Sequence, residues 1–176
     1  MNHTKNAPAK LDLTGLIKNY ANYNLWAYKQ LVDWLKTKPS SAMNKEVPSS
    51  FPSLQLTLLH IWKIQRFWLA TLTQTHESLS YADFEGTLDE LFEGFISQSS
   101  EFSEYVNSLD EVALTENSYL KTPWFEANLP RFEYVQHCMN HSTYHRGQLI
   151  TIGRNVGLTD APMTDYNFYN IMITAR

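Results

Sequence analysis

Four long stretches of the sequence repeat their apolar residues with the period of an α-helix, and this pattern restricts the fold more than any other feature. Such spacing gives each helix an apolar face that another element must cover. A chain of 176 residues with four such helices suits one domain. We therefore predict a single all-α domain over residues 1–176, built as a four-helix bundle. The stretches run from about Thr14 to Lys36, from after Ser53 to about Thr75, from Thr87 to near Asp110, and from Leu129 or Pro130 to Asn155.

Residues at the ends of these stretches favour helix starts and stops. Thr14 and Ser53 are predicted N-caps, because a hydroxyl can accept a hydrogen bond from a free N–H of the first turn. Thr87 and Glu90 have the spacing of a capping box. Gly157 suits the C-terminal cap of the last long helix.

Two segments outside these helices carry structure of their own. The connection from Asp110 to Asn128 is long for a plain loop and contains strand-like pieces. We predict that it is a long crossover connection with a short β-hairpin before the last helix. The tail, residues 158–176, keeps enough aromatic side chains to pack back on the bundle.

Charge and cysteine content exclude several classes of function. The net charge is −4 and no cluster of Lys and Arg interleaves with the aromatic residues, so nucleic-acid binding is not expected. Cys138 is the only cysteine, which excludes an intrachain disulfide and a thiolate metal cluster. The N-terminus lacks the apolar core of a signal peptide and no apolar run reaches the length of a membrane span. A cytoplasmic protein without membrane contact is expected.

The last long stretch contains three histidines, His137, His141 and His145, spaced four residues apart. On a helix, positions four apart lie about 40° apart in projection and about 6 Å apart along the axis. Two neighbouring imidazoles can therefore hold one transition metal, whereas His137 and His145, about 12 Å apart, cannot share it. The pair is either His137 with His141 or His141 with His145, and a further ligand has to come from another helix.

His60 is the strongest candidate for that ligand, because it interrupts the apolar stripe of Leu56, Leu59 and Phe67 in the second stretch. A lone histidine on such a stripe is more often a hydrogen-bonded core residue, and an H-x3-H pair also occurs by chance. The two features together favour a metal site. Ser142 follows His141, so the glutamate of an H-E-x-x-H protease helix is absent.

Three segments together resemble the DinB family, which includes the YfiT-like proteins. These are "YNLWAYKQLV", "SFPSLQLTLLHIWKIQRFWL" and "HCMNHSTYHRGQL", and the tail "PMTDYNFYNI" is also similar. The resemblance implies a four-helix bundle of up-down-down-up order that often forms a homodimer. It also implies a divalent ion, typically nickel or zinc, held at one end of the bundle. Carried over by position, the ligands are His60, His141 and His145, with His137 in a supporting or core role.

Other side chains are candidates for the surroundings of such a site. Tyr144, Gln148 and Asp165 could reach it, although none is an obvious general base. Arg146 is expected either to pair with a carboxylate or to meet an anionic substrate. Gly147 costs about 1 kcal/mol relative to alanine in mid-helix, so a close approach of two helices is the expected compensation.

The resemblance implies an enzyme acting on a small molecule. Some members of the family resemble thiol-dependent S-transferases that use a low-molecular-weight thiol, and others are described as metal-dependent hydrolases. The contrasting hypothesis is a metal-binding stress-response or interaction protein without catalysis. An open coordination position beside a substrate pocket distinguishes the two. No catalytic residue is identified from the sequence.

Overall fold

The computed structural model describes residues 12–75, 84–121 and 125–174 and is predominantly helical, as predicted. All four periodic stretches form helices. None of the helices within these ranges is long and apolar enough to cross a membrane. The four long helices are α1 (Leu13–Lys36), α3 (Leu54–Thr73), α4 (Leu88–Ser108) and α6 (Arg131–Asn155).

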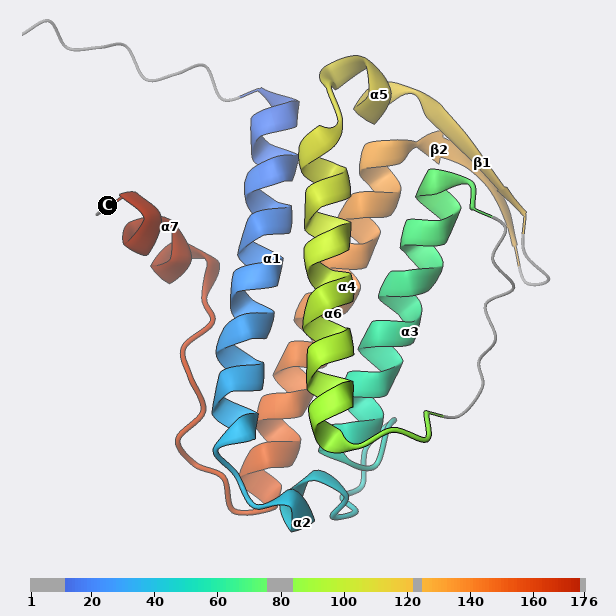
Figure 1. The fold of residues 1–176 in the computed structure, drawn as a ribbon. Helices are drawn as coiled ribbons and strands as arrows, with labels where there is room; N and C mark the ends of the chain where they lie inside the picture. The colour runs from blue at the N-terminus through green and yellow to red at the C-terminus, as the bar shows by residue number, and fades with distance from the viewer. Residues whose placement is uncertain (1–11, 76–83, 122–124, 175–176) are drawn as a thin grey trace, which may run out of the picture.

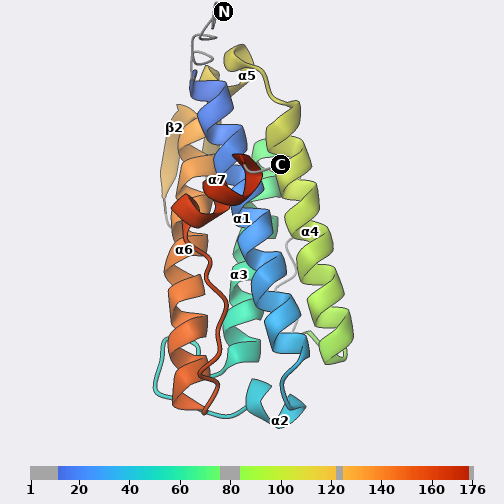
Figure 2. The same cartoon turned by 90° about the vertical axis from the view of Figure 1, so that its left-hand side faces the viewer.

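The long helices lie side by side, and α1 and α6 run opposite to α3 and α4 (Figures 1 and 2). This arrangement corresponds to the up-down-down-up order. Helix α1 packs mainly on α4, and α3 packs mainly on α6. Helices α3 and α4 run in the same direction (Figure 1), and the residues between them include 76–83, which lie outside the described residues. The crossover was predicted before α6, but α4 ends at the same end of the bundle at which α6 begins (Figure 1).

The helix ends show which capping predictions hold. Ser53 and Thr87 cap α3 and α4 as predicted, and the capping box after Thr87 is complete. The predicted cap at Thr14 is wrong, because α1 begins at Leu13 and its cap residue lies two positions before Thr14. Asp12 caps it, accepting a hydrogen bond from the Gly15 backbone N–H at 2.7 Å. A carboxylate also interacts favourably with the positive end of the helix dipole, which a hydroxyl does not.

The predicted hairpin is present immediately before α6. Strand β1 (Asn117–Lys121) pairs antiparallel with β2 (Glu126–Pro130). Helix α6 begins at the residue after β2, and the Tyr134 hydroxyl donates a hydrogen bond to the Ser118 carbonyl oxygen at 2.9 Å. The hairpin therefore fixes the position of the first turns of α6, the helix that carries three of the histidines.

Three short helices were not predicted as separate elements: α2 (Ser40–Met43), α5 (Glu111–Thr115) and α7 (Tyr166–Thr174). Helix α7 lies beside α1, on the side away from α3 (Figure 1). The Asn19 side-chain amide donates a hydrogen bond to the Tyr166 hydroxyl at 2.8 Å. The prediction that the tail packs back on the bundle is thus confirmed.

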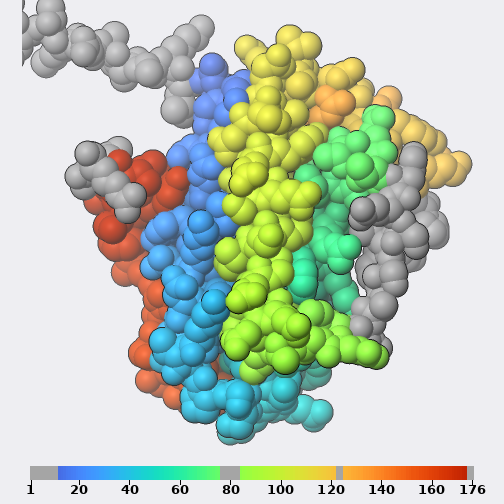
Figure 3. Space-filling view, in the orientation of Figure 1, coloured from blue at the N-terminus to red at the C-terminus, as the bar shows by residue number. Residues whose placement is uncertain are grey.

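Among the described residues the core consists of three clusters of buried side chains, and the two larger ones lie at the hairpin end of the bundle and near α2. The first includes Trp68, Phe102 and Met139, and the second includes Tyr28, Phe95 and Leu149. Along α6 the histidines at 141 and 145 fall between the two clusters. Figure 3 shows the face on which the side chains of α1, α4 and α3 pack together, and the candidate site belongs to the seam between α3 and α6.

Candidate metal centre

Three histidines from two helices meet at the α3–α6 seam. Nε2 of His60, on α3, lies 3.0 Å from Nε2 of His141 and 3.1 Å from Nε2 of His145, both on α6. One ligand nitrogen from each residue lies within 4.8 Å of the other two. His145 is buried, and the other two side chains are partly exposed. The seam thus forms a group of three nitrogen ligands that is open on one side.

The structure distinguishes between the two pairs that the helical spacing left open. His141 and His145 are the pair that meets His60. His137 is exposed, and its ring centroid lies 6.4 Å from that of His141. Its ring forms a T-shaped pair with Trp68, with centroids 4.9 Å apart. His137 therefore stands one turn outside the three-nitrogen group.

Gln148 determines which nitrogen of His145 carries hydrogen. Its Oε1 lies 2.6 Å from Nδ1 of His145, and its Nε2 donates a hydrogen bond to the Tyr144 hydroxyl at 3.2 Å. An amide oxygen can only accept, so Nδ1 of His145 has to be the donor. In the neutral ring the lone pair then lies on Nε2, the atom that faces the other two histidines.

The surroundings keep these imidazoles neutral. Burial, followed by the charges of His145 and Lys63, lowers the pKa of His60 from 6.5 to about 4. Burial, followed by the neighbouring His145 and His60, lowers the pKa of His141 to about 3. Burial also lowers the pKa of His145, with the Gln148 hydrogen bond acting in the opposite direction. Neutral imidazole is the form that binds metals.

A divalent cation fits this arrangement better than hydrogen bonds alone. An ion about 2.1 Å from two imidazole nitrogens separates them by about 3.0 Å at a right angle and by about 3.4 Å at the tetrahedral angle. The observed separations of 3.0 and 3.1 Å lie at the lower end of this range. A hydrogen on Nε2 of His60 can satisfy one neighbouring nitrogen but not both, whereas one cation attracts all three lone pairs.

Acidification is expected to destabilise the metal-free protein through these histidines. Because the pKa values of His60 and His141 in the fold lie below 6.5, the unfolded chain binds protons that the folded chain does not. Their contribution to stability is complete above about pH 6.5 and is lost as the pH falls toward 4. We expect the melting temperature to fall over this range less steeply in a His60→Gln/His141→Gln double variant, measured by circular dichroism without metal. Parallel pH profiles for the two proteins would contradict this expectation.

A cavity adjoins the histidine group on the side of α3. Its volume is about 400 Å³. The Phe51 ring stacks on the His60 ring with centroids 3.9 Å apart and forms part of the cavity wall. Lys63, one turn after His60, also lines the cavity. A small molecule in this cavity would lie beside one member of the histidine group.

Comparison with known proteins places the chain in a family. A model of the DinB family matches residues 1–174. The chain belongs to the DinB family. Protein DinB of Bacillus subtilis (strain 168) is 29% identical over 164 residues, which cover 85% of this chain and 91% of that protein.

Solved structures agree with this DinB assignment. A DinB-like protein from Bacillus cereus ATCC 10987 has a TM-score of 0.68 at 18% identity, covering 86% of this chain and 96% of that one. A DinB-like protein from Bacillus subtilis has a TM-score of 0.58 at 15% identity, with the same coverage of each chain. At these identities the likeness concerns the fold alone.

Two of the residues that were predicted to surround the site lie beside the histidine group. Gln148 contacts His145 directly, and the Tyr144 ring packs edge-on against the His145 ring with centroids 4.9 Å apart. The Tyr144 side chain is 63% exposed, and its hydroxyl accepts the Gln148 hydrogen bond. Tyr144 therefore borders the open side of the group.

Arg146 and Asp165 do not lie at the histidine group, contrary to expectation. Arg146 is buried at the α1–α6 contact, where it donates hydrogen bonds to Asn24, Tyr23 and Thr143. These partners are neutral, and none of the ion pairs among the described residues includes Arg146. Asp165 precedes α7 and lies close enough to Tyr23 for its charge to raise the pKa of that phenol, although burial is the largest cause of the shift.

The surroundings of Gly147 also differ from the prediction. Gly147 is exposed, and a Cβ atom added there would have no neighbour within 4 Å among the described residues. The expected close approach of a second helix is therefore not found at this glycine within the part of the chain that the structure describes. The close approach occurs instead at Gly94 on α4, where a Cβ atom would lie 2.3 Å from the Trp62 ring.

Phe51 and Lys63 are the contributors that sequence reasoning missed. Phe51 lies before α3, where neither periodicity nor residue type indicates contact with a histidine. Lys63 could have been found, because it follows His60 by three residues and so lies on the same side of the helix. His3 and His76 lie outside the described residues.

Proposed function

We propose that the chain binds one divalent transition metal ion through Nε2 of His60, His141 and His145. The observation that supports this most directly is the convergence of three neutral imidazoles on one point. The hydrogen bond between Nδ1 of His145 and Gln148 also supports it, because it leaves the lone pair of His145 on Nε2, which faces that point. Imidazole ligands suit nickel and zinc, the two metals implied by the family resemblance.

We further propose that the metal serves a reaction on a small molecule. Three protein ligands leave at least one coordination position open, as in catalytic sites, and a bound ion there can polarise a substrate or lower the pKa of water. The cavity of about 400 Å³ beside His60 supports a substrate site rather than a purely structural ion. Among the described residues, the histidine group contains no carboxylate, so the ligands that the chain supplies are neutral.

The reaction we propose is one of the two that the family resemblance implies. These are a thiol-dependent S-transfer with a low-molecular-weight thiol and a hydrolysis. In either case the chain's own part is to hold the ion, to keep Nε2 of His145 unprotonated through Gln148, and to shield one side of His60 with Phe51. We also propose that the chain forms a homodimer and acts in the cytoplasm.

Elemental analysis of tag-free protein tests the metal site. After reconstitution with nickel or zinc and removal of excess ion, the wild type is expected to carry about one equivalent per chain, since three imidazoles define one site. His145→Ala is expected to retain little metal, whereas His137→Ala is expected to retain it fully. A wild type without stoichiometric metal, or a full equivalent in His145→Ala, would disprove the assignment.

A further inference from the structure

The cavity beside His60 has an apolar wall and a polar edge. Phe51, Leu56, Leu59 and Phe84 line it, and Leu56 is 45% exposed. Covering a large aliphatic side chain that is exposed to this extent is favourable, because it removes apolar surface from water. The wall is therefore suited to the hydrocarbon or aromatic part of a small ligand.

Lys63 supplies the charge at this cavity. Lys63 and His60 both line it, and the Lys63 ammonium lies close enough to His60 to contribute to lowering the pKa of the imidazole. No acidic residue is among the side chains described as lining the cavity. The ion pairs found within residues 12–75, 84–121 and 125–174 do not include Lys63. Among the described residues, no acidic side chain therefore competes with an anionic group that enters beside the histidines for the ammonium.

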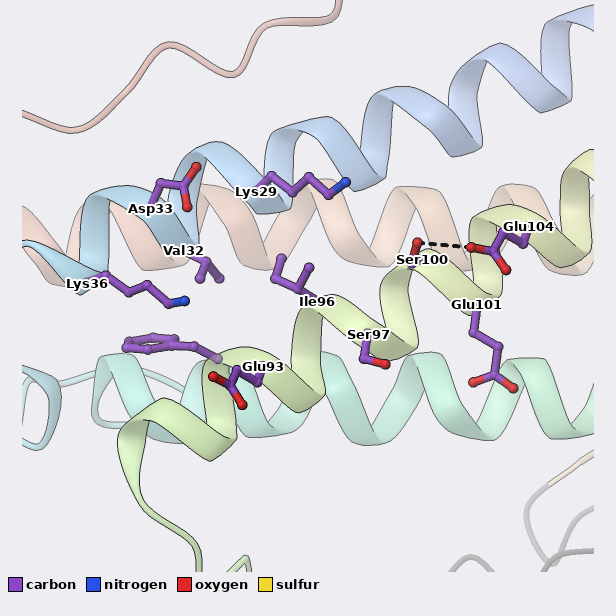
Figure 4. Close-up of a pocket in the computed structure, with 11 residues that line it drawn as sticks. Lys29, Val32, Asp33, Lys36, Glu93, Ile96, Ser97, Ser100, Glu101 and Glu104 are labelled. Atoms are coloured by element: carbon purple, nitrogen blue, oxygen red, sulfur yellow. Dashed lines mark hydrogen bonds between the residues drawn. The ribbon is translucent and has the colours of Figure 1, made fainter.

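A larger groove of the molecule has a different charge distribution. It lies between α1 and α4 and has a volume of about 830 Å³. Figure 4 shows Lys29 and Lys36 on α1, with Glu93, Glu101 and Glu104 on α4. An anion in this groove would meet repulsion from the glutamates as well as attraction from the lysines. The cavity beside His60 is therefore better suited to an anion than the larger groove.

We propose that the cavity beside His60 binds an amphipathic small-molecule anion, with its apolar part against Phe51, Leu56 and Phe84 and its anionic group at Lys63. This inference rests on the proposed function and names the class of substrate that the site takes. A carboxylate or a similar anion bound there would place its neighbouring atoms beside the histidine group. Lys63 then acts in substrate recognition, separately from the metal ligands.

Calorimetric titration of metal-loaded protein with matched probes tests this substrate class. The probes are 4-phenylbutyrate, its neutral amide 4-phenylbutyramide, and butyrate, which lacks the ring. In the wild type, 4-phenylbutyrate is expected to bind about fivefold more tightly than the amide, which corresponds to the upper end of the range for a partly exposed charge pair. Butyrate is expected to bind more weakly than 4-phenylbutyrate, because it cannot cover the apolar wall.

Lys63→Gln is expected to bind the acid and the amide equally. The matched control is Lys29→Gln, which removes a lysine from the α1–α4 groove and from a smaller cavity beside α7. This control is expected to keep the wild-type preference. The proposal fails if Lys63→Gln keeps the preference for the acid, if Lys29→Gln loses it, or if the wild type shows none.

Metal content measured on the same samples separates this inference from the proposed function. A wild type that binds its full equivalent of metal but does not prefer the acid contradicts the substrate class alone. A preference that survives in Lys63→Gln and disappears in His145→Ala means that the ion, not the lysine, recognises the carboxylate, and it overturns the role of Lys63. A wild type without metal contradicts the metal site, while a lysine-dependent preference in that protein would still support the anion subsite.

Discussion

Removal of metal by a chelator is expected to lower the melting temperature of the wild-type protein on the order of 10 °C. An ion that binds only the folded chain, at a free concentration about 1,000 times its dissociation constant, stabilises the fold by about 4 kcal/mol. For a chain of this size each kcal/mol corresponds to about 2–4 °C. The effect is large because the three ligands come from two helices, α3 and α6, whose contact is lost on unfolding. Differential scanning calorimetry with and without chelator measures it.

Variants of two histidines on the same helix provide the control. His145→Ala removes one of the three converging nitrogens, so chelator is expected to leave its melting temperature unchanged. His137→Ala removes an exposed imidazole one turn outside the group and is expected to show the full wild-type shift. Equal shifts in all three proteins would mean that the chelator acts elsewhere.

The positions of the long helices could be predicted because their signals are local. The period of the apolar residues, the caps at Ser53 and Thr87, and the hairpin segment each depend on neighbours in the chain. The start of α1 was misplaced because the Asp12 carboxylate, two residues before Thr14, accepts the hydrogen bond from the Gly15 N–H and caps the helix. The crossover was misplaced because helix direction depends on which helices pack together, and the local pattern of a connection does not carry that information.

The candidate site was predictable where helix geometry was sufficient. Spacing alone excluded His137 and His145 as one pair, and the structure brings His141 and His145 to His60. The choice between the two possible pairs depends on how far α6 is shifted along α3, which spacing within one helix does not determine. The family resemblance supplied the same three residues by position.

The expectation for Arg146 could have been corrected from the sequence. It follows His145 directly, and successive residues of a helix point about 100° apart. A residue next to a ligand therefore faces a different neighbour, in this case α1 rather than α3. Asp165 could not have been placed in the same way, because it belongs to the segment before α7, whose path over α1 no helical period describes.

Arg146→Met is expected to destabilise the metal-free protein by about 3 kcal/mol while leaving its metal content unchanged. Arg146 is 3% exposed, and its guanidinium donates a hydrogen bond to the Tyr23 hydroxyl at 2.8 Å. It also donates to Oδ1 of the buried Asn24, so methionine leaves that oxygen without its charged donor. The Tyr23 hydroxyl in turn donates to the Thr164 carbonyl oxygen at 2.7 Å, so the loss extends to the segment before α7. Urea unfolding of metal-free samples measures the change in free energy.

Comparison with His145→Ala separates the roles of these adjacent residues. Methionine preserves much of the buried arginine's apolar volume, so the expected loss comes from the hydrogen bonds and not from a cavity. Because Arg146 faces α1 and the three nitrogens face the α3–α6 seam, reconstituted Arg146→Met is expected to carry one equivalent of metal, whereas His145→Ala carries little. Loss of metal in Arg146→Met with unchanged stability of the metal-free form would instead show that Arg146 acts on the histidine group and not on the α1–α6 contact.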